Sequence, residues 1–406
     1  MVSADSEISK PQLRNVISSR MVVFVVFFDL FIQFPIVAPY ARELGASPSY
    51  VGVIMAAYSA TNLFGNIITG RLVDFLGRKI PIILGAVVTS IALLGYAAAT
   101  SPLILLLSRV VHGFASSSLT PGSFAMLGDI SPSNRRASVM GLSGAFVAIA
   151  AIIGPPFAGI GKDYFGTEFV FIFGSMLMAF SGLIFWILST ETGYSDTRGG
   201  GQGLSKFFSE SNLLNVFNRG LGLACIAVLA FTIGLGNLVT QLPLALESLE
   251  LSSSVASSVF TVYALTAMLM MVTPIRTLSD KYNRILFLNL GLVTMGLGIG
   301  LLGFYPGIVG AFLGMAIYGL GFGILFPAAT ALVVDSTLVE NRGLGFGIFY
   351  GVYSAGVVIG SLMSGILTDI HGDNSGIPFI ISAFVVLSVS TPSFLSAFSR
   401  NLNSKE

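Results

Sequence analysis

Twelve apolar runs of roughly 20 residues constrain this chain more than any other feature. A bilayer core about 30 Å thick needs about 20 apolar residues per crossing helix, about twice the length of a barrel strand. The runs also lack the strict alternation of strands, so we expect helices, whose backbone groups are paired internally. Between the polar breaks the runs cover 16–40, 49–70, 80–99, 102–128, 137–161, 168–189, 220–246, 253–276, 285–303, 306–334, 342–367 and 376–398. The sequence therefore predicts an all-α integral membrane protein with twelve transmembrane helices.

Composition excludes several classes of protein. Of 406 residues only 10% are charged, which is too few to cover the surface of a soluble domain of this length. A net charge of +1 offers no basic face, so no nucleic-acid partner is expected. One cysteine and two histidines argue against disulfides and metal sites. The sequence shows no phosphate-binding P-loop and no catalytic cluster, so we expect neither an enzyme nor a cofactor.

Lys and Arg set the orientation, because they accumulate on the cytoplasmic side of membrane proteins. If the N-terminus lies inside, seventeen of the 20 basic residues fall on the cytoplasmic side. Arg42 and Lys162 fall outside, and Arg109 lies within a span. We therefore predict a multi-pass protein of the cell (plasma or inner) membrane with both termini in the cytoplasm.

A repeat divides the chain into halves. Adding 206 to residue numbers carries Asp74 to Asp280 and Arg78 to Arg284, and brings many loop and helix glycines into coincidence. Two parallel repeats of six helices are typical of transporters whose halves rock about a central site. The predicted organisation is a cytoplasmic tail, a six-helix bundle, a cytoplasmic linker, a second six-helix bundle and a second tail, at 1–15, 16–189, 190–219, 220–398 and 399–406.

The segment GRLVDFLGRK at 70–79 resembles the loop signature G-x-L-x-D-R-x-G-R-K of the major facilitator superfamily, with Phe75 replacing the usual arginine. A degenerate copy, RTLSDKYNRI, follows in the second half. The resemblance spans essentially the whole chain and implies that superfamily's fold, with a cytoplasmic gate in which Asp74 caps a helix of the other half. The gate residues that it implies are Gly70, Asp74, Gly77, Arg78, Lys79, Asp129, Arg136, Asp280, Arg284, Asp335 and Arg342.

The segment AIAAIIGPPFAG at 148–159 resembles the span-5 signature of drug and metabolite antiporters in this superfamily. Gly154, Pro155 and Gly159 match that signature, whereas Ala150 and Ala158 replace two of its glycines. Small residues let a neighbouring helix approach, and a proline weakens the helix and permits a bend. The resemblance therefore favours an exporter, and helix packing alone is the alternative.

Charged residues inside the membrane are costly, so they mark functional sites. Away from the ends of the predicted spans, Asp29 is the one carboxylate, near the middle of its span, and Arg109 is the one cation. We expect Asp29 either to carry a coupling proton, which Arg109 would tune, or to form a permanent ion pair with Arg109. Arg109 bonded to backbone carbonyls is a further alternative. His112, on a neighbouring face, either titrates or packs.

The resemblance places spans 1, 4, 7 and 10 around a central cavity. The candidate cavity residues are Gln33, Ser116, Asn237, Gln241, Tyr318, Phe322, Phe326, Tyr350 and Tyr353. At the offset of 206, Gln241 corresponds to Pro35, so the second half shows no carboxylate matching Asp29. So few polar groups favour a small amphiphilic substrate, exported by a monomer in the lipid bilayer in exchange for protons. A symporter or facilitator for a sugar or organic acid is the alternative.

Overall fold

Helices formed by the apolar runs make up nearly all of the computed structural model, which describes residues 10–131, 136–192, 218–273, 283–338, 342–373 and 375–403. The helices are α1 (Lys10–Gln33), α2 (Val37–Glu43), α3 (Pro48–Leu76), α4 (Lys79–Ala97), α5 (Pro102–Ser116), α6 (Leu119–Ile130), α7 (Arg136–Phe165), α8 (Thr167–Leu188), α11 (Arg219–Glu247), α12 (Ser253–Val272), α14 (Arg284–Phe304), α15 (Ile308–Ser336), α16 (Arg342–His371) and α17 (Ile377–Asn403).

Two of the predicted spans are interrupted, and a proline accounts for each break. Pro35 has no N–H for the helix ladder, and the chain turns between α1 and α2 at this point. Pro121 likewise cannot donate to the carbonyl four residues earlier, at Ser117, where α5 ends and α6 begins. The side chain of Ser118 donates to the Pro81 carbonyl at 3.0 Å. The breaks therefore leave the two parts of each span packed in one crossing.

The described helices make twelve crossings when α1–α2 and α5–α6 each count as one, as the sequence predicts. Ten of the helical segments are long and apolar enough to cross a membrane, and α3 and α17 complete the set. Large apolar side chains on the outside, such as Ile91, Trp186 and Phe384, are more than half exposed. A soluble protein rarely exposes so many, so this surface fits contact with lipid.

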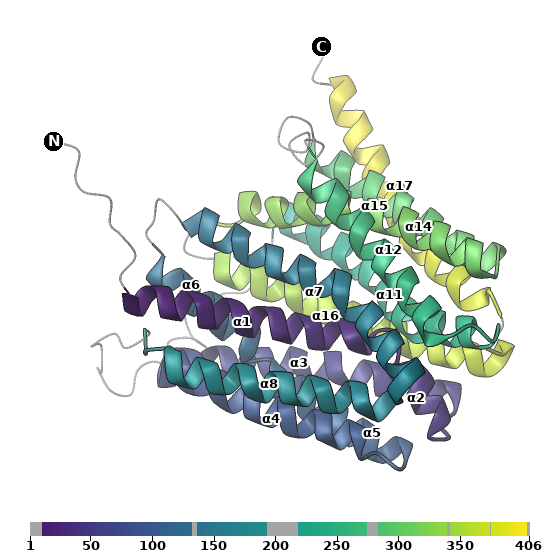
Figure 1. The fold of residues 1–406 in the computed structure, drawn as a ribbon. Helices are drawn as coiled ribbons and strands as arrows, with labels where there is room; N and C mark the ends of the chain where they lie inside the picture. Colours follow the sequence, from purple (N-terminus) through teal and green to yellow (C-terminus); the bar gives the residue numbers. More distant parts are fainter. Residues whose placement is uncertain are drawn as a thin grey trace.

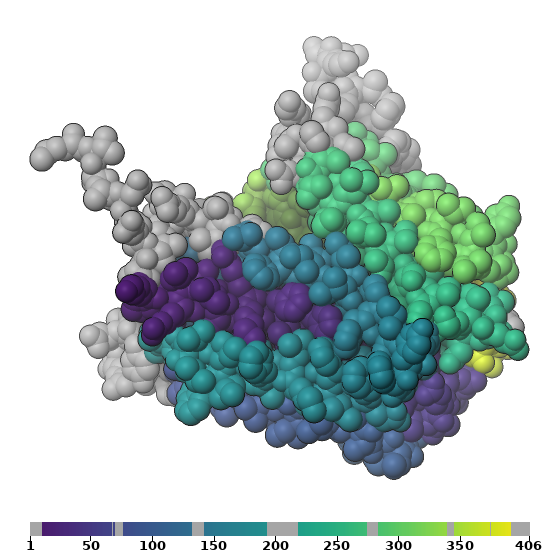
Figure 2. Space-filling view, viewed as in Figure 1, coloured from purple at the N-terminus to yellow at the C-terminus, as the bar shows by residue number. Residues whose placement is uncertain are grey.

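The crossings form two halves, α1–α8 and α11–α17, which Figure 1 shows as two sets of long helices whose axes run at an angle to each other. The most extensive contacts between the halves are those of α3 with α16 and of α7 with α12, and α11 also contacts α2 and α3. Figure 2 shows the purple-to-blue first half in contact with the green second half on the visible face of the molecule. Among the described residues, the hydrogen bonds and ion pairs between the halves lie at the end that carries α2 and the N-termini of α3 and α12.

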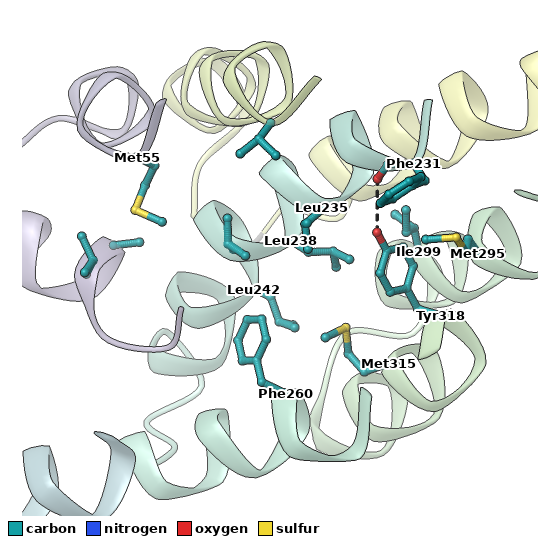
Figure 3. Close-up of a cluster of buried hydrophobic side chains, with 14 of the residues drawn as sticks. Met55, Phe231, Leu235, Leu238, Leu242, Phe260, Met295, Ile299, Met315 and Tyr318 are labelled. Atoms are coloured by element: carbon teal, nitrogen blue, oxygen red, sulfur yellow. Dashed lines mark hydrogen bonds between the residues drawn. The ribbon is translucent and has the colours of Figure 1, made fainter. Parts of the chain in front are cut away.

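The buried core of the second half is apolar. Figure 3 shows Leu235 and Leu238 of α11 facing Ile299 of α14 and Tyr318 of α15. The Tyr318 hydroxyl donates to the Phe231 carbonyl at 3.2 Å, which satisfies a polar atom that would otherwise be costly to bury. This cluster includes no charged side chain. The first half places a different set of residues at the corresponding depth.

Candidate functional site

Asp29 and His112 meet inside the first half. Asp29 Oδ2 on α1 lies 2.9 Å from His112 Nε2 on α5, and both residues are almost fully buried. The other ring nitrogen, Nδ1, lies 3.0 Å from the hydroxyl of Tyr96 on α4. An oxygen atom therefore lies within 3.0 Å of each ring nitrogen of His112, the Asp29 carboxylate at Nε2 and the Tyr96 hydroxyl at Nδ1.

Gln33 stands between Asp29 and Arg109. Its amide nitrogen donates to Asp29 Oδ1 at 2.9 Å, and its amide oxygen accepts from Arg109 Nη1 at 3.1 Å. Arg109 also donates to the carbonyls of Ile54 at 2.7 Å and Met55 at 3.3 Å, both on α3. Of the alternatives that the sequence left open, the structure shows Arg109 bonded to backbone carbonyls, and the Gln33 side chain links it to Asp29 in place of a direct ion pair.

Two tyrosines that sequence reasoning missed enclose this site. The ring of Tyr58 packs edge-on against His112, with 5.0 Å between centroids, and lies 5.6 Å from the Arg109 guanidinium carbon. Ser116, a predicted cavity residue, donates to the Tyr58 hydroxyl at 3.0 Å. The signal in the sequence was a tyrosine within an apolar run, since a buried hydroxyl needs a polar partner. We call Asp29, Gln33, Tyr58, Tyr96, Arg109 and His112 the polar cluster.

The second half holds an uncharged copy of the polar cluster. The stretch DLFIQFP at 29–35 matches NLVTQLP at 237–243, so a shift of 208 pairs Asp29 with Asn237. The expectation that used 206 throughout missed this match, because the loops after the two stretches differ in length. The offset of 206 does hold for α5, pairing Arg109 with Met315 and His112 with Tyr318.

Glycine contacts support this correspondence in three dimensions. Gly113 packs against α3, on the carbonyl of Tyr58 and on the side chain of Thr61, one helical turn after Tyr58. Gly319 packs in the same way on the Tyr263 carbonyl. The ring of Tyr263 then lies against Tyr318, with centroids 5.6 Å apart, as Tyr58 does against His112.

The predicted cavity residues of the second half occupy two environments. Asn237 and Gln241 are fully buried, and they donate to the carbonyls of Pro378 at 3.1 Å and Asp373 at 2.9 Å. The aromatic residues instead form two groups of ring contacts, in one of which Phe322 stacks on Phe326 with centroids 5.1 Å apart, and the buried rings of Phe231 and Phe349 connect this pair to Tyr353, Phe346 and Tyr350. Tyr350, on α16, is 47% exposed. We call Phe322, Phe326, Phe346, Tyr350 and Tyr353 the aromatic surface.

The predicted gate residues form matching ion pairs within each half. Arg78 Nε lies 3.1 Å from Asp129 Oδ2, and Arg284 Nη1 lies 2.8 Å from Asp335 Oδ2. Gly77 has a φ of +86°, a conformation that favours glycine. Asp280 lies outside the described residues, and so do the side chains of Asp74, Arg136 and Arg342 and the surroundings of Gly70.

Glu191 adds a contact to this region that the sequence did not suggest. Its two carboxylate oxygens accept from the backbone amides of Arg78 at 2.7 Å and Lys79 at 3.0 Å. The side chain of Lys79 donates to the Ser189 carbonyl at 2.6 Å. A carboxylate at the start of α4 is favourable because unpaired amides and the helix dipole concentrate positive charge there.

Pro155 and Gly159 lie within α7, which continues through both Pro155 and Pro156 to Phe165. A side chain at Gly154 would crowd the Cβ atom of Phe31 on α1, at 3.0 Å. Gly159 instead contacts α12 of the other half. The small residues of this signature therefore face two different helices, as close helix packing requires.

Comparison with known proteins decides the family. The family model of the Major Facilitator Superfamily matches residues 21–244 and again 224–401. The chain belongs to the Major Facilitator Superfamily. Membership places it among membrane transporters rather than enzymes, and agrees with the twelve crossings in two halves.

Relatives within the superfamily include two bacterial resistance proteins. Quinolone resistance protein NorA of Staphylococcus aureus (strain MSSA476) is 25% identical over 358 residues, covering 86% of this chain and 90% of the relative. Multidrug resistance protein 2 of Bacillus subtilis (strain 168) is 26% identical over 375 residues, covering 90% of each.

Solved structures of the superfamily's fold are similar along almost the whole chain. A bacterial homolog of the human lysosomal transporter Spinster, in an inward-facing and unoccupied conformation, superposes with a TM-score of 0.79 at 16% identity, covering 95% of this chain and 97% of that one. A peptide transporter POT in complex with sulfate superposes with a TM-score of 0.77 at 13% identity, covering 95% of this chain and 94% of that one. At these identities the likeness concerns the fold alone.

Proposed function

We propose that this protein exports small amphiphilic compounds in exchange for protons, by alternating access, as a monomer of the cell membrane with both termini in the cytoplasm. The observation that carries the proposal is the buried pair of Asp29 and His112, 2.9 Å apart between α1 and α5. The proton gradient then supplies the energy, and no cofactor takes part.

Because the Asp29–His112 pair is buried, a change in its charge strongly affects the neighbouring charged groups. In a low-dielectric interior, adding one proton changes the balance of charges around Arg109 far more than it would in water. The Gln33 amide transmits the change, because its nitrogen bonds the carboxylate and its oxygen bonds the guanidinium. A conformation that binds the proton better is favoured once the proton arrives. Protonation of the Asp29–His112 pair can therefore bias the two halves towards one of two arrangements.

The aromatic surface supports an amphiphilic substrate. Stacked rings such as Phe322 and Phe326 present flat apolar faces, and ring faces also attract organic cations. Tyr350, partly exposed on α16, adds a hydroxyl at the edge of this surface. The names of the two resistance proteins, which concern quinolones and multiple drugs, agree with a substrate of this kind.

Reconstituted vesicles test the proposal. With a pH gradient imposed across the membrane, ethidium or a quinolone is expected to accumulate against its own gradient while the pH gradient dissipates. Asp29→Asn should abolish accumulation but retain exchange of labelled for unlabelled substrate, which needs no net proton movement. Glu168→Gln, which removes an exposed carboxylate at the start of α8, serves as the matched control.

The two outcomes that oppose the proposal are distinct. Full gradient-driven accumulation by Asp29→Asn would remove this carboxylate from the coupling step. Movement of substrate and protons in the same direction would instead favour a symporter, for which sugars and organic acids are the probes to screen next.

A further inference from the structure

Two aspartates join the halves at the end opposite the chain termini. Each stands four residues after a glycine, Gly159 before Asp163 on α7 and Gly365 before Asp369 on α16. The two Gly-x-x-x-Asp segments are 206 residues apart, so they are copies of one feature in the repeat. Residues four apart share a helix face, and therefore each glycine and aspartate face the same neighbour.

Asp163 caps a helix of the other half. Its Oδ1 accepts from the backbone amide of Ser253 at 3.0 Å, and its Oδ2 accepts from the amide of Ser254 at 2.9 Å and from the Ser254 hydroxyl at 2.5 Å. These are the first two residues of α12, whose own N-cap residue, Ser252, makes no side-chain cap. The start of α12 thus obtains its side-chain cap from α7.

Asp369 makes the corresponding contact more weakly. Its Oδ2 accepts from the amide of Ser49, the second residue of α3, at 3.1 Å. Here the local N-cap is in place, because the Ser47 side chain accepts from the Tyr50 amide. The α3 terminus therefore keeps a cap of its own if Asp369 withdraws, whereas α12 does not keep one without Asp163.

The glycines allow these contacts to form. A Cβ atom on Gly365 would lie 2.6 Å from the Pro48 carbonyl oxygen, and one on Gly159 would lie 2.5 Å from the Ser253 carbonyl oxygen. Both distances are too short for a side chain facing rigid backbone, so the helices approach each other only because these positions are glycine. Each aspartate, one turn further, then reaches the free amides of the partner helix.

We propose that Asp163 and Asp369 are paired latches that hold this end of the transporter closed, and that the Asp163 latch is the stronger. The inference rests on the alternating access of the proposed function, but it depends on neither the substrate nor the coupling proton. To open this end, the halves must break three hydrogen bonds at Asp163 and one at Asp369. A carboxylate bound to helix amides makes strong, charge-assisted bonds, so these contacts favour the closed arrangement.

Ion pairs beside the latches make a smaller contribution. Arg42 pairs with Asp373 of the other half at 3.0 Å, with both side chains about one-third exposed. Lys162 lies 2.7 Å from Glu43 in its own half and 3.8 Å from Glu247 in the other. Water and salt screen such pairs, so we assign the closure mainly to the aspartates.

Distance measurements between the halves test this inference. Nitroxide labels at Thr100 and Tyr305, which are exposed in the loops after α4 and α14, report the opening of this end in a Cys225→Ser background. By double electron–electron resonance, Asp163→Ala should raise the ratio of open to closed molecules roughly tenfold, since several charge-assisted bonds are lost. Asp369→Ala should raise it roughly threefold, because only one bond is lost.

Two further variants keep the test decisive. Asp163→Asn, which retains an acceptor oxygen, should fall between the wild type and Asp163→Ala. Glu168→Ala removes a carboxylate at the same end and should leave the distances unchanged. An unchanged distribution in Asp163→Ala, or an equal shift in Glu168→Ala, would overturn the latch assignment. The proposed function is tested by gradient-driven flux in Asp29→Asn, whereas the latches are tested by distances in protein whose Asp29 is intact, so failure of one can be told apart from failure of the other.

Discussion

The two halves build the same site on the same helices, but only the first half places an aspartate, an arginine and a histidine in it. Asp29, Arg109 and His112 in one half stand where Asn237, Met315 and Tyr318 stand in the other. The shared features are those that a helix bundle needs, namely the glycine contacts and the buried tyrosines. The differences concern charge, which is expensive to bury and persists where it has a function. The proton coupling that we propose is therefore placed in the first half.

The tyrosine in place of His112 shows how the second half remains folded without that chemistry. The Tyr318 hydroxyl finds the Phe231 carbonyl, and its ring packs on Tyr263. His112 finds Asp29 and Tyr96 instead. In the second half a single hydroxyl needs a partner, whereas in the first half the two ring nitrogens of His112 lie against a carboxylate and a hydroxyl. Exchanging residues between the halves is thus the direct way to separate folding from coupling.

Moving the carboxylate from one half to the other has the largest expected effect. In the double variant Asp29→Asn with Asn237→Asp, gradient-driven flux should fall by about a hundredfold, because the transferred carboxylate meets the Pro378 carbonyl, to which Asn237 now donates, instead of a histidine. Flux measured in vesicles, normalised to protein, gives the comparison with the wild type. Coupled transport at wild-type rate would show that either half can carry the proton.

Removing the Arg109 cation should have the next largest effect, in this case on the stability of the protein. Arg109→Met copies the second half but leaves Gln33 and the carbonyls of Ile54 and Met55 without their donor. We expect a loss of about 3 kcal/mol in the free energy of unfolding. Thermal unfolding in detergent measures it, with Met315→Leu as a control that should cost below about 1.5 kcal/mol. Equal losses in the two variants would contradict a special role for the cation.

Adding the carboxylate alone to the second half should destabilise the protein by about 2 kcal/mol. In the wild type, Asn237 Oδ1 is already buried without a hydrogen-bond partner among the described residues. Asn237→Asp therefore places a carboxylate charge at a buried site whose oxygen lacks a donor. The unfolding temperature should fall at neutral pH and recover in acid, since protonation removes the charge. A temperature that is independent of pH would indicate that water reaches this site.

Loss of the Tyr96 hydroxyl should have the smallest effect on stability, about 1 kcal/mol for one buried hydrogen bond. Because this hydroxyl bonds His112 Nδ1, Tyr96→Phe should also shift the pH dependence of transport. Tyr318→Phe removes a similar bond in the second half and should lower stability without shifting that pH dependence. A shift of the same size in both variants would mean that the hydroxyls act only through packing.

Hydropathy and repeat spacing were enough to predict the helices, because lipid requires long apolar segments and the loop residues recur at one offset. The breaks after Gln33 and Ser116 were not predicted, since a proline within an apolar run allows a kink as readily as a break. The helix ends also differ from the predicted span ends. For example, α1 begins at Lys10, six residues before the predicted span.

The candidate site was predictable in its residues but not in its pairings. Asp29, Arg109 and His112 stood out because charge is rare in the spans, yet spacing within one helix cannot show which side chain of another helix lies opposite. Gln33 is the example, since it was assigned to the cavity and in the structure it links Asp29 to Arg109. Glu191 was missed because a linker carboxylate looks like any solvent-exposed charge until the fold brings it to α4.

Proton release on substrate binding tests the central claim most directly. If the Asp29–His112 pair exchanges its proton for substrate, purified protein in weakly buffered detergent solution should release about one proton per bound substrate. Asp29→Asn should bind substrate and release none, whereas Glu168→Gln should behave as the wild type. Release of the same number of protons by Asp29→Asn would contradict the assignment of coupling to this pair.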